Sequence, residues 1–232
     1  MANYHGRKSL DLGLLEIETK INALDLRILE VFENTFTSFY EKDLEKSKKV
    51  IENDYLINQA SLEIENNSID VIRRETPLAS DMRKLTSYMF VSQELERIGD
   101  YLSGICKINL KIGKEPFITK FEKIPKMEAI AKNMLKDSIK LFSNIPDEEK
   151  AIIAARKIFS QDDEIDYLNY QVQNDLIKRM SRNSKLVEQG TYIIWVAHNL
   201  ERISDRANNI AERTIYVITG DSGAIVPYEL EE

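Results

Sequence analysis

The most constraining feature of this sequence is a long stretch without glycine or proline, which runs from Leu14 to Thr76. The whole chain of 232 residues has only 8 glycines and 5 prolines. β-Sandwiches and barrels turn back every ~8–12 residues and need such residues at their turns. The sequence therefore predicts an all-α fold, and with 43% hydrophobic residues the chain can bury a sizeable core.

Composition also argues against several classes of protein. No apolar run approaches the ~20 residues of a membrane span, and residues 1–8 lack the apolar segment of a signal peptide. The single Cys106 suits a reducing compartment, so we expect a cytoplasmic protein. A net charge of −7 argues against a nucleic-acid partner, and only two histidines argue against a His-rich catalytic metal centre.

Apolar residues recur at helical spacing in two segments that lie 105 residues apart. The later segment contains Val196, Leu200, Ile203, Ala207, Ile210, Thr214 and Val217. The earlier one contains Val91, Leu95, Ile98, Leu102 and Ile105. Residues 94–105 and 199–210 are identical at six of twelve aligned positions. The pattern indicates an internal duplication into two similar halves.

Helix-breaking residues divide each half into three expected helices. Those of the first half are 9–40, 44–74 and 77–112, with Thr76 as the N-cap of the third and Pro77 as its first residue. The break near 40–43 is inferred because one helix reaching Thr76 would exceed ~90 Å. The second half repeats the plan over 117–143, 146–180 and 184–219. We therefore expect two units, 9–112 and 117–220, joined by a linker at 113–116 and followed by a loose tail at 221–232.

Carboxylates recur in pairs spaced four residues apart, which places both members on one helix face. These pairs are Glu96 with Asp100, Asp162 with Asp166, and Glu201 with Asp205. Like charges at this spacing destabilise a helix by a few tenths of a kcal/mol. The pairs lie beside the two apolar helix faces described above, which we call the apolar seams. The acids are therefore expected to point sideways or outward.

Hairpin geometry brings these pairs together. Residues 166 and 201 have the same midpoint as residues 162 and 205, and it falls in the expected turn at 181–184. An antiparallel hairpin therefore places four carboxylates in one patch. In the first half, Asp54 with Asp100 and Asn58 with Glu96 share a midpoint at Pro77. The same constellation thus occurs twice, with Asn58 in place of one acid.

Converging carboxylates repel one another unless a cation neutralises them, and hard cations prefer oxygen ligands. We expect Mg, Ca or Mn, with Zn or Fe as further options. The candidate metal ligands are Asp54, Glu96, Asp100, Asp162, Asp166, Glu201 and Asp205. The second site should bind more strongly because it gathers one more charge. The alternative is an acidic face that is simply solvated.

Residues 95–100 and 200–212, which both contain Leu-Glu-Arg-Ile followed by Gly-Asp or Ser-Asp, resemble the signature of the PhoU family. Residues 77–83 are similar to that family's Pro-x-Ala-Ser-Asp-Leu-Arg segment. The resemblance covers roughly residues 9–220. It implies two pseudo-symmetric three-helix bundles that hold metal ions on their acidic pairs.

The resemblance also implies a function. PhoU proteins are negative regulators of phosphate uptake and of phosphate-starvation signalling. It implies contact with the ATPase subunit of the Pst phosphate ABC transporter and with a sensor histidine kinase, membrane complexes that the protein would touch only peripherally. It further implies a homodimer and no enzymatic activity. Two alternatives stay open: a metal-free structural helical adaptor, and a di-metal carboxylate enzyme, which usually needs Glu-x-x-His ligands that this sequence lacks.

Overall fold

A computed structural model describes residues 3–118 and 122–221, and within these ranges the secondary structure is helical, without a strand. The expected tail lies outside the described residues except for Asp221. The helices are α1 (Asn3–Glu41), α2 (Leu44–Glu75), α3 (Ala79–Ile112), α4 (Lys123–Ser143), α5 (Glu148–Arg182) and α6 (Val187–Thr219), with a 3₁₀ turn at Ser184–Leu186. The all-α prediction is confirmed.

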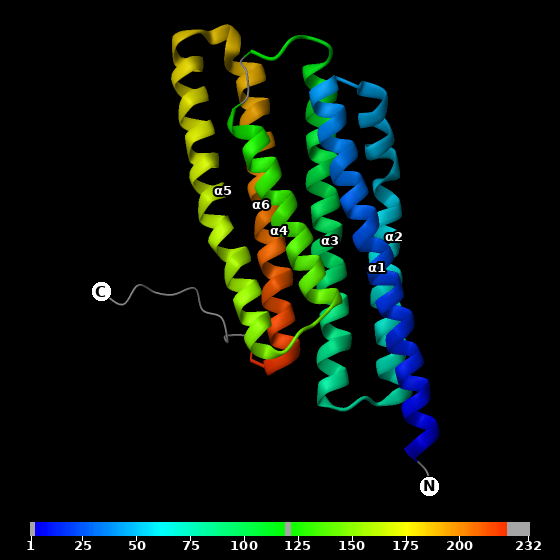
Figure 1. The fold of residues 1–232 in the computed structure, drawn as a ribbon. Coiled ribbons are helices and arrows are strands. Elements are labelled where there is room, and N and C mark those ends of the chain that lie inside the picture. Colours follow the sequence, from blue (N-terminus) through cyan, green and yellow to red (C-terminus); the bar gives the residue numbers. More distant parts are fainter. Residues whose placement is uncertain (1–2, 119–121, 222–232) are drawn as a thin grey trace, which may run out of the picture.

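Figure 1 shows the helices side by side in two bundles, α1–α3 and α4–α6. The bundles meet mainly along α3 and α6, while α2 and α5 form opposite edges of the molecule. One hydrophobic core runs through the contact and includes Leu95 and Ile98 from α3 and Leu200 and Ile203 from α6, all fully buried. The two predicted seams are thus the inner faces of the two central helices.

Helix starts differ from the sequence prediction: α1 begins at Asn3 rather than at 9, and α3 to α6 begin later than predicted. Thr76 is not the N-cap of the third helix but the left-handed C-cap of α2, with φ 43° and ψ 61°. Pro77 disfavours the α region for the residue before it, so Thr76 ends one helix and α3 starts only at Ala79. The fourth helix starts at Lys123 rather than at 117, which places Pro125 in its first turn, where proline is tolerated.

The predicted break between the first two helices is confirmed. Lys42 adopts a positive φ of 56°, and Asp43 then caps α2 by accepting a hydrogen bond from the backbone N–H of Lys46 at 2.9 Å. The ammonium group of Lys42 lies 3.5 Å from the ring centroid of Phe117 in the linker between the bundles. The turn therefore also anchors the linker.

None of the helices in the described parts of the chain combines the length and the apolarity that crossing a bilayer would require.

Candidate functional site

The first acidic patch joins Asp54 of α2 to Glu96 and Asp100 of α3. Burial and the charge of Asp100 raise the pKa of Asp54, and burial, Asp100 and Asp54 raise the pKa of Glu96. Gly99 lets the two helices approach, because a Cβ there would lie 3.0 Å from Cδ1 of Ile57 and 3.6 Å from Oδ1 of Asp54. Asn58 is exposed on α2, one turn beyond Asp54.

The second acidic patch joins Asp162 and Asp166 of α5 to Glu201 and Asp205 of α6. Burial, together with the charges of Asp166 and Asp205, raises the pKa of Asp162 to about 6. Burial is also the main cause of the raised pKa values of Asp166 and Glu201, and Asp205 adds to both. The hairpin thus brings acids of both helices within electrostatic reach of one another.

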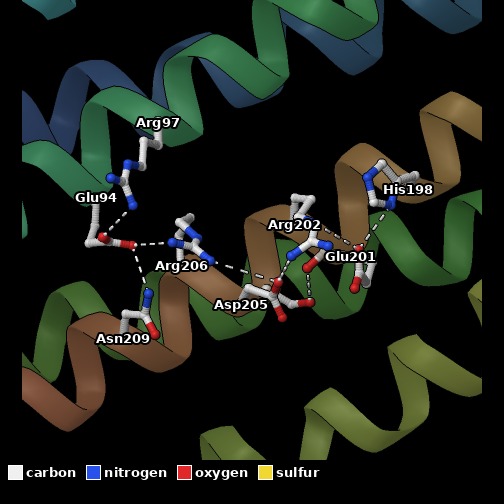
Figure 2. Close-up of polar contacts among 9 residues, drawn as sticks. Glu94, Arg97, His198, Glu201, Arg202, Asp205, Arg206 and Asn209 are labelled. Carbon is white, nitrogen blue, oxygen red and sulfur yellow. Dashed lines mark hydrogen bonds and ion pairs between the residues drawn. The ribbon is translucent and has the colours of Figure 1, made fainter.

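Basic side chains line the α6 side of this patch, as Figure 2 shows. Arg202 donates to Oδ2 of Asp205 at 2.9 Å and places its Nε 3.6 Å from Oε2 of Glu201. Nδ1 of His198 lies 3.2 Å from the same Glu201 oxygen. Arg202 and His198 therefore already place nitrogen atoms against the acids of this patch.

The donor set of the second patch suits a hard cation in chemistry but is not gathered around one point. Oδ1 of Asp162 is buried and has no hydrogen-bond partner among the described residues, whereas Oε2 of Glu201 lies against His198 and Arg202. Oxygens of this kind are what a hard cation seeks. Within residues 3–118 and 122–221, however, no three Asp, Glu, His or Cys side chains are placed to hold a metal ion.

A buried carboxylate that the sequence analysis did not single out links the two bundles (Figure 2). Glu94 of α3 has a 4% exposed side chain and accepts hydrogen bonds from Arg97 at 3.3 Å, Arg206 at 3.2 Å and Asn209 at 2.9 Å. Arg97 thus pairs with Glu94, three residues before it on α3. Arg206 also lies 3.8 Å from Asp205, so the link extends to the second patch. A signal was available, because Glu94 opens the duplicated segment.

The duplication places a neutral contact at the equivalent position of the other half. Shifting Glu94 by 105 residues gives Asn199, whose side-chain amide donates to the backbone carbonyl of Tyr101 at 3.4 Å. The same amide lies 3.0 Å from where a Cβ on Gly104 would be. Tyr101 and Gly104 are in turn the equivalents of Arg206 and Asn209. The α3–α6 contact is therefore pseudo-symmetric in position but not in charge.

The two bundles also correspond to two copies of one family domain. The sequence profile described as the PhoU domain matches residues 21–108 and again residues 124–214. The chain belongs to the PhoU family. Each PhoU domain falls within one three-helix bundle, which confirms the internal duplication and the resemblance seen in residues 95–100 and 200–212.

Relatives and solved structures agree with this membership. A phosphate-specific transport system accessory protein PhoU homolog of Streptococcus pneumoniae is 30% identical over 215 residues, covering 93% of this chain and 97% of the relative. One from Clostridium acetobutylicum is 28% identical, with coverages of 92% and 96%. The crystal structure of the phosphate transport system regulatory protein PhoU from S. pneumoniae covers 91% of this PhoU chain and 98% of its own, with a TM-score of 0.81. PhoU from Pseudomonas aeruginosa, at 23% identity and a TM-score of 0.85, shares the fold.

Proposed function

We propose that this protein is the accessory regulator of a phosphate-specific transport system, and that it restrains phosphate uptake and starvation signalling when phosphate is ample. The observation that carries this proposal is the match of both bundles to the PhoU domain, supported by relatives of that name along almost their whole length. The expected partners are the transporter's ATPase subunit and a sensor histidine kinase, reached from the cytoplasmic side. The chain would act by binding and not by catalysis.

The position of the acids favours a regulator over a di-metal enzyme. Enzymes of that class hold their metals inside a four-helix core, with ligands from facing helices. Here Asp100 and Asp166 are exposed, and the buried inner faces of α3 and α6 are occupied by residues such as Leu95 and Leu200. The acids therefore lie where a partner protein or a dissolved ion reaches them.

We also propose that the patches take up divalent or iron ions, with Mg, Ca, Mn, Zn and Fe as the options. Asp162, Asp166, Glu201 and Asp205 would hold the ion of the second bundle, and Asp54, Glu96 and Asp100 that of the first. A bound cation would supply the positive charge that offsets the mutual repulsion of these acids. In the second bundle Arg202 already supplies part of that charge, so the ion and Arg202 would compete for Asp205.

Deletion of the gene tests the regulatory proposal. Under phosphate-replete growth the deletion strain should take up more phosphate and express more starvation genes, and the intact gene should reverse both effects. A pull-down from replete cells should recover the transporter ATPase subunit and a sensor kinase. Unchanged uptake and expression would refute the proposal.

A complementation arm separates the metal-bearing regulator from a metal-free adaptor. The deletion strain is complemented with a Glu201→Ala/Asp205→Ala variant, whose altered positions lie off the buried seam. Failure of this variant to restore repression, with normal protein levels, supports a role for the patch. Full restoration would favour the metal-free adaptor.

A further inference from the structure

The outer face of α5 carries large apolar side chains that its own bundle does not cover. Tyr167, Tyr170 and Ile177 are 61%, 64% and 53% exposed. Their spacing places them on one side of the helix, opposite the buried Ile165, Leu168, Val172 and Leu176. Figure 1 shows α5 at the edge of the molecule. We call Tyr167, Tyr170 and Ile177 the outer strip of α5. Such clusters on a surface mark interaction sites more often than scattered apolar residues do.

Charges of opposite sign lie at the two ends of this strip. Asp163 and Glu164 precede it, whereas Lys178 and Arg182 follow it, and all four are exposed. Glu164 pairs with Lys126 of α4 at 2.6 Å, but that pair is about half exposed and therefore weak. The outer strip thus has an acidic end, an aromatic and aliphatic middle, and a basic end.

This order is complementary to itself when reversed. An antiparallel alignment of two α5 helices that sets Tyr167 against Ile177 of a second copy has its centre at Val172. The same alignment sets Asp163 and Glu164 within one helical turn of Lys178 and Arg182 of that copy. Each of these contacts occurs twice, as a two-fold symmetric interface requires.

We propose that the outer strip of α5 is the contact surface between two copies of this chain, arranged antiparallel about a two-fold axis that crosses the helix pair at the level of residue 172. Tyrosine side chains suit such a surface because they bury a large apolar ring and keep a polar end in water. The opposite charges fix the register and the antiparallel direction.

The equivalent face of α2 provides an internal comparison. Tyr55, Leu62 and Ile69 are 54%, 56% and 46% exposed at seven-residue spacing. When α2 is aligned with α5 so that Asp54 corresponds to Asp162, Leu62 and Ile69 correspond to Tyr170 and Ile177. The ends of the α2 strip, however, carry mixed charges: Lys48 pairs with Glu45 before it, and Arg73 and Arg74 pair with Asp70 after it. The α2 strip therefore lacks the oppositely charged ends that would fix an antiparallel pair.

Charge reversal on the full-length protein tests the proposal. Sedimentation velocity over a range of concentrations should show the parent as a dimer. Lys178→Glu/Arg182→Glu makes both ends of the strip acidic, and Asp163→Lys/Glu164→Lys makes both basic. Each variant alone should dimerise at least tenfold more weakly, and an equimolar mixture should form the dimer again. A Leu62→Glu/Ile69→Glu variant on α2 is the matched control and should dimerise like the parent.

The outcomes are separable from folding and from the proposed function. Circular dichroism melting identifies any variant that fails to fold, and the recovery of dimer on mixing cannot come from unfolded chains. The measurement needs neither phosphate nor metal, so it can fail while the proposed function stands. A parent that is monomeric throughout, variants that dimerise normally, or loss of the dimer in the α2 control would each overturn the proposal.

Discussion

Asp25 is a buried acid at the junction of the two bundles. It lies on α1 with 4% exposure, and the hydroxyl of Ser143 at the end of α4 donates to its Oδ2 at 3.2 Å. Its Oδ1 receives no hydrogen bond from the described residues. Burial raises the pKa of Asp25 from 3.8 to about 7. The native protein therefore holds this proton under conditions in which the unfolded chain has lost it.

Asp25→Asn should stabilise the protein, and the gain should grow with pH. Between about pH 4 and 7 the native state binds a proton that the unfolded state does not, so stability falls as pH rises through this window. The rise in pKa corresponds to at most about 4 kcal/mol. We expect the gain in unfolding free energy to be about 2–3 kcal/mol larger at pH 8 than at pH 5. Urea unfolding at the two values measures it, and an equal gain at both would contradict the pKa.

Glu94 shows what a single sequence does not reveal at the scale of residues. A carboxylate within a helix that also carries Arg97 is expected at the surface, because acids are almost never fully buried unless paired. Its decisive partners, Arg206 and Asn209, come from α6 more than a hundred positions later in the chain. Removing one member of such a buried pair costs about 3–5 kcal/mol, so the pairing decides where the residue lies.

At the scale of elements, Thr76 adopts a sterically unfavourable conformation where α2 ends. A β-branched residue in the left-handed region is unusual, since that conformation costs non-glycine residues roughly 1–2 kcal/mol. The side chain is exposed, so its removal sacrifices little packing. Thr76→Gly should therefore raise the free energy of unfolding by about 0.5–1 kcal/mol, after the added freedom of the unfolded chain is counted. Thermal melting or urea unfolding measures this gain.

Lys42 is the matched control, because it also has a positive φ, of 56°. Its ammonium group, unlike the exposed Thr76 side chain, rests on the ring of Phe117. Lys42→Gly relieves the backbone but loses this contact of about 0.5–1 kcal/mol, so the net change should be close to zero. Equal stabilisation by both substitutions would show that the Phe117 contact contributes nothing.

The helices could be predicted from sequence better than their ends. The number, order and pairing of the helices could be predicted from three features: the lack of glycine and proline, the apolar periodicity of seven residues, and the 105-residue duplication. The starts of α3 and α4 were misplaced because a proline is compatible both with a helix start and with the residues before one. Backbone angles at Thr76, and the packing of Phe117 against Phe39 at 5.1 Å between ring centroids, decided these ends.

At the scale of the whole molecule, the two bundles should differ in metal affinity. Affinity for hard cations rises with the number of ligand charges, and the second patch has four acids where the first has three and Asn58. Divalent metal should raise the melting temperature. Glu201→Ala or Asp205→Ala should remove more bound metal than Glu96→Ala or Asp100→Ala. Calorimetric titration of the variants decides this: equal losses would refute the asymmetry, and a parent that binds no metal would refute the site.

Hairpin symmetry predicted which acids share a patch, and the effect of the Asp205 charge on the pKa values of Asp162 and Asp166 agrees with that alignment. The basic residues that offset the charge of these acids were harder to predict. Arg206 faces away from the hairpin toward α3, so its role depends on how the two bundles dock. The binding of metal by these acids stays a prediction.

The unequal contacts of Glu94 and Asn199 have a consequence for the history of the chain. Two copies of the first half would set each Glu94 against Tyr101 and Gly104, leaving it only the 3.3 Å contact with Arg97 of its own helix. Two copies of the second half would set each Asn199 against Arg206 and Asn209, with no acid between them. Either pairing would lose the hydrogen bonds that Arg206 and Asn209 donate to Glu94. Divergence at this contact has therefore made the two copies within one gene complementary rather than interchangeable.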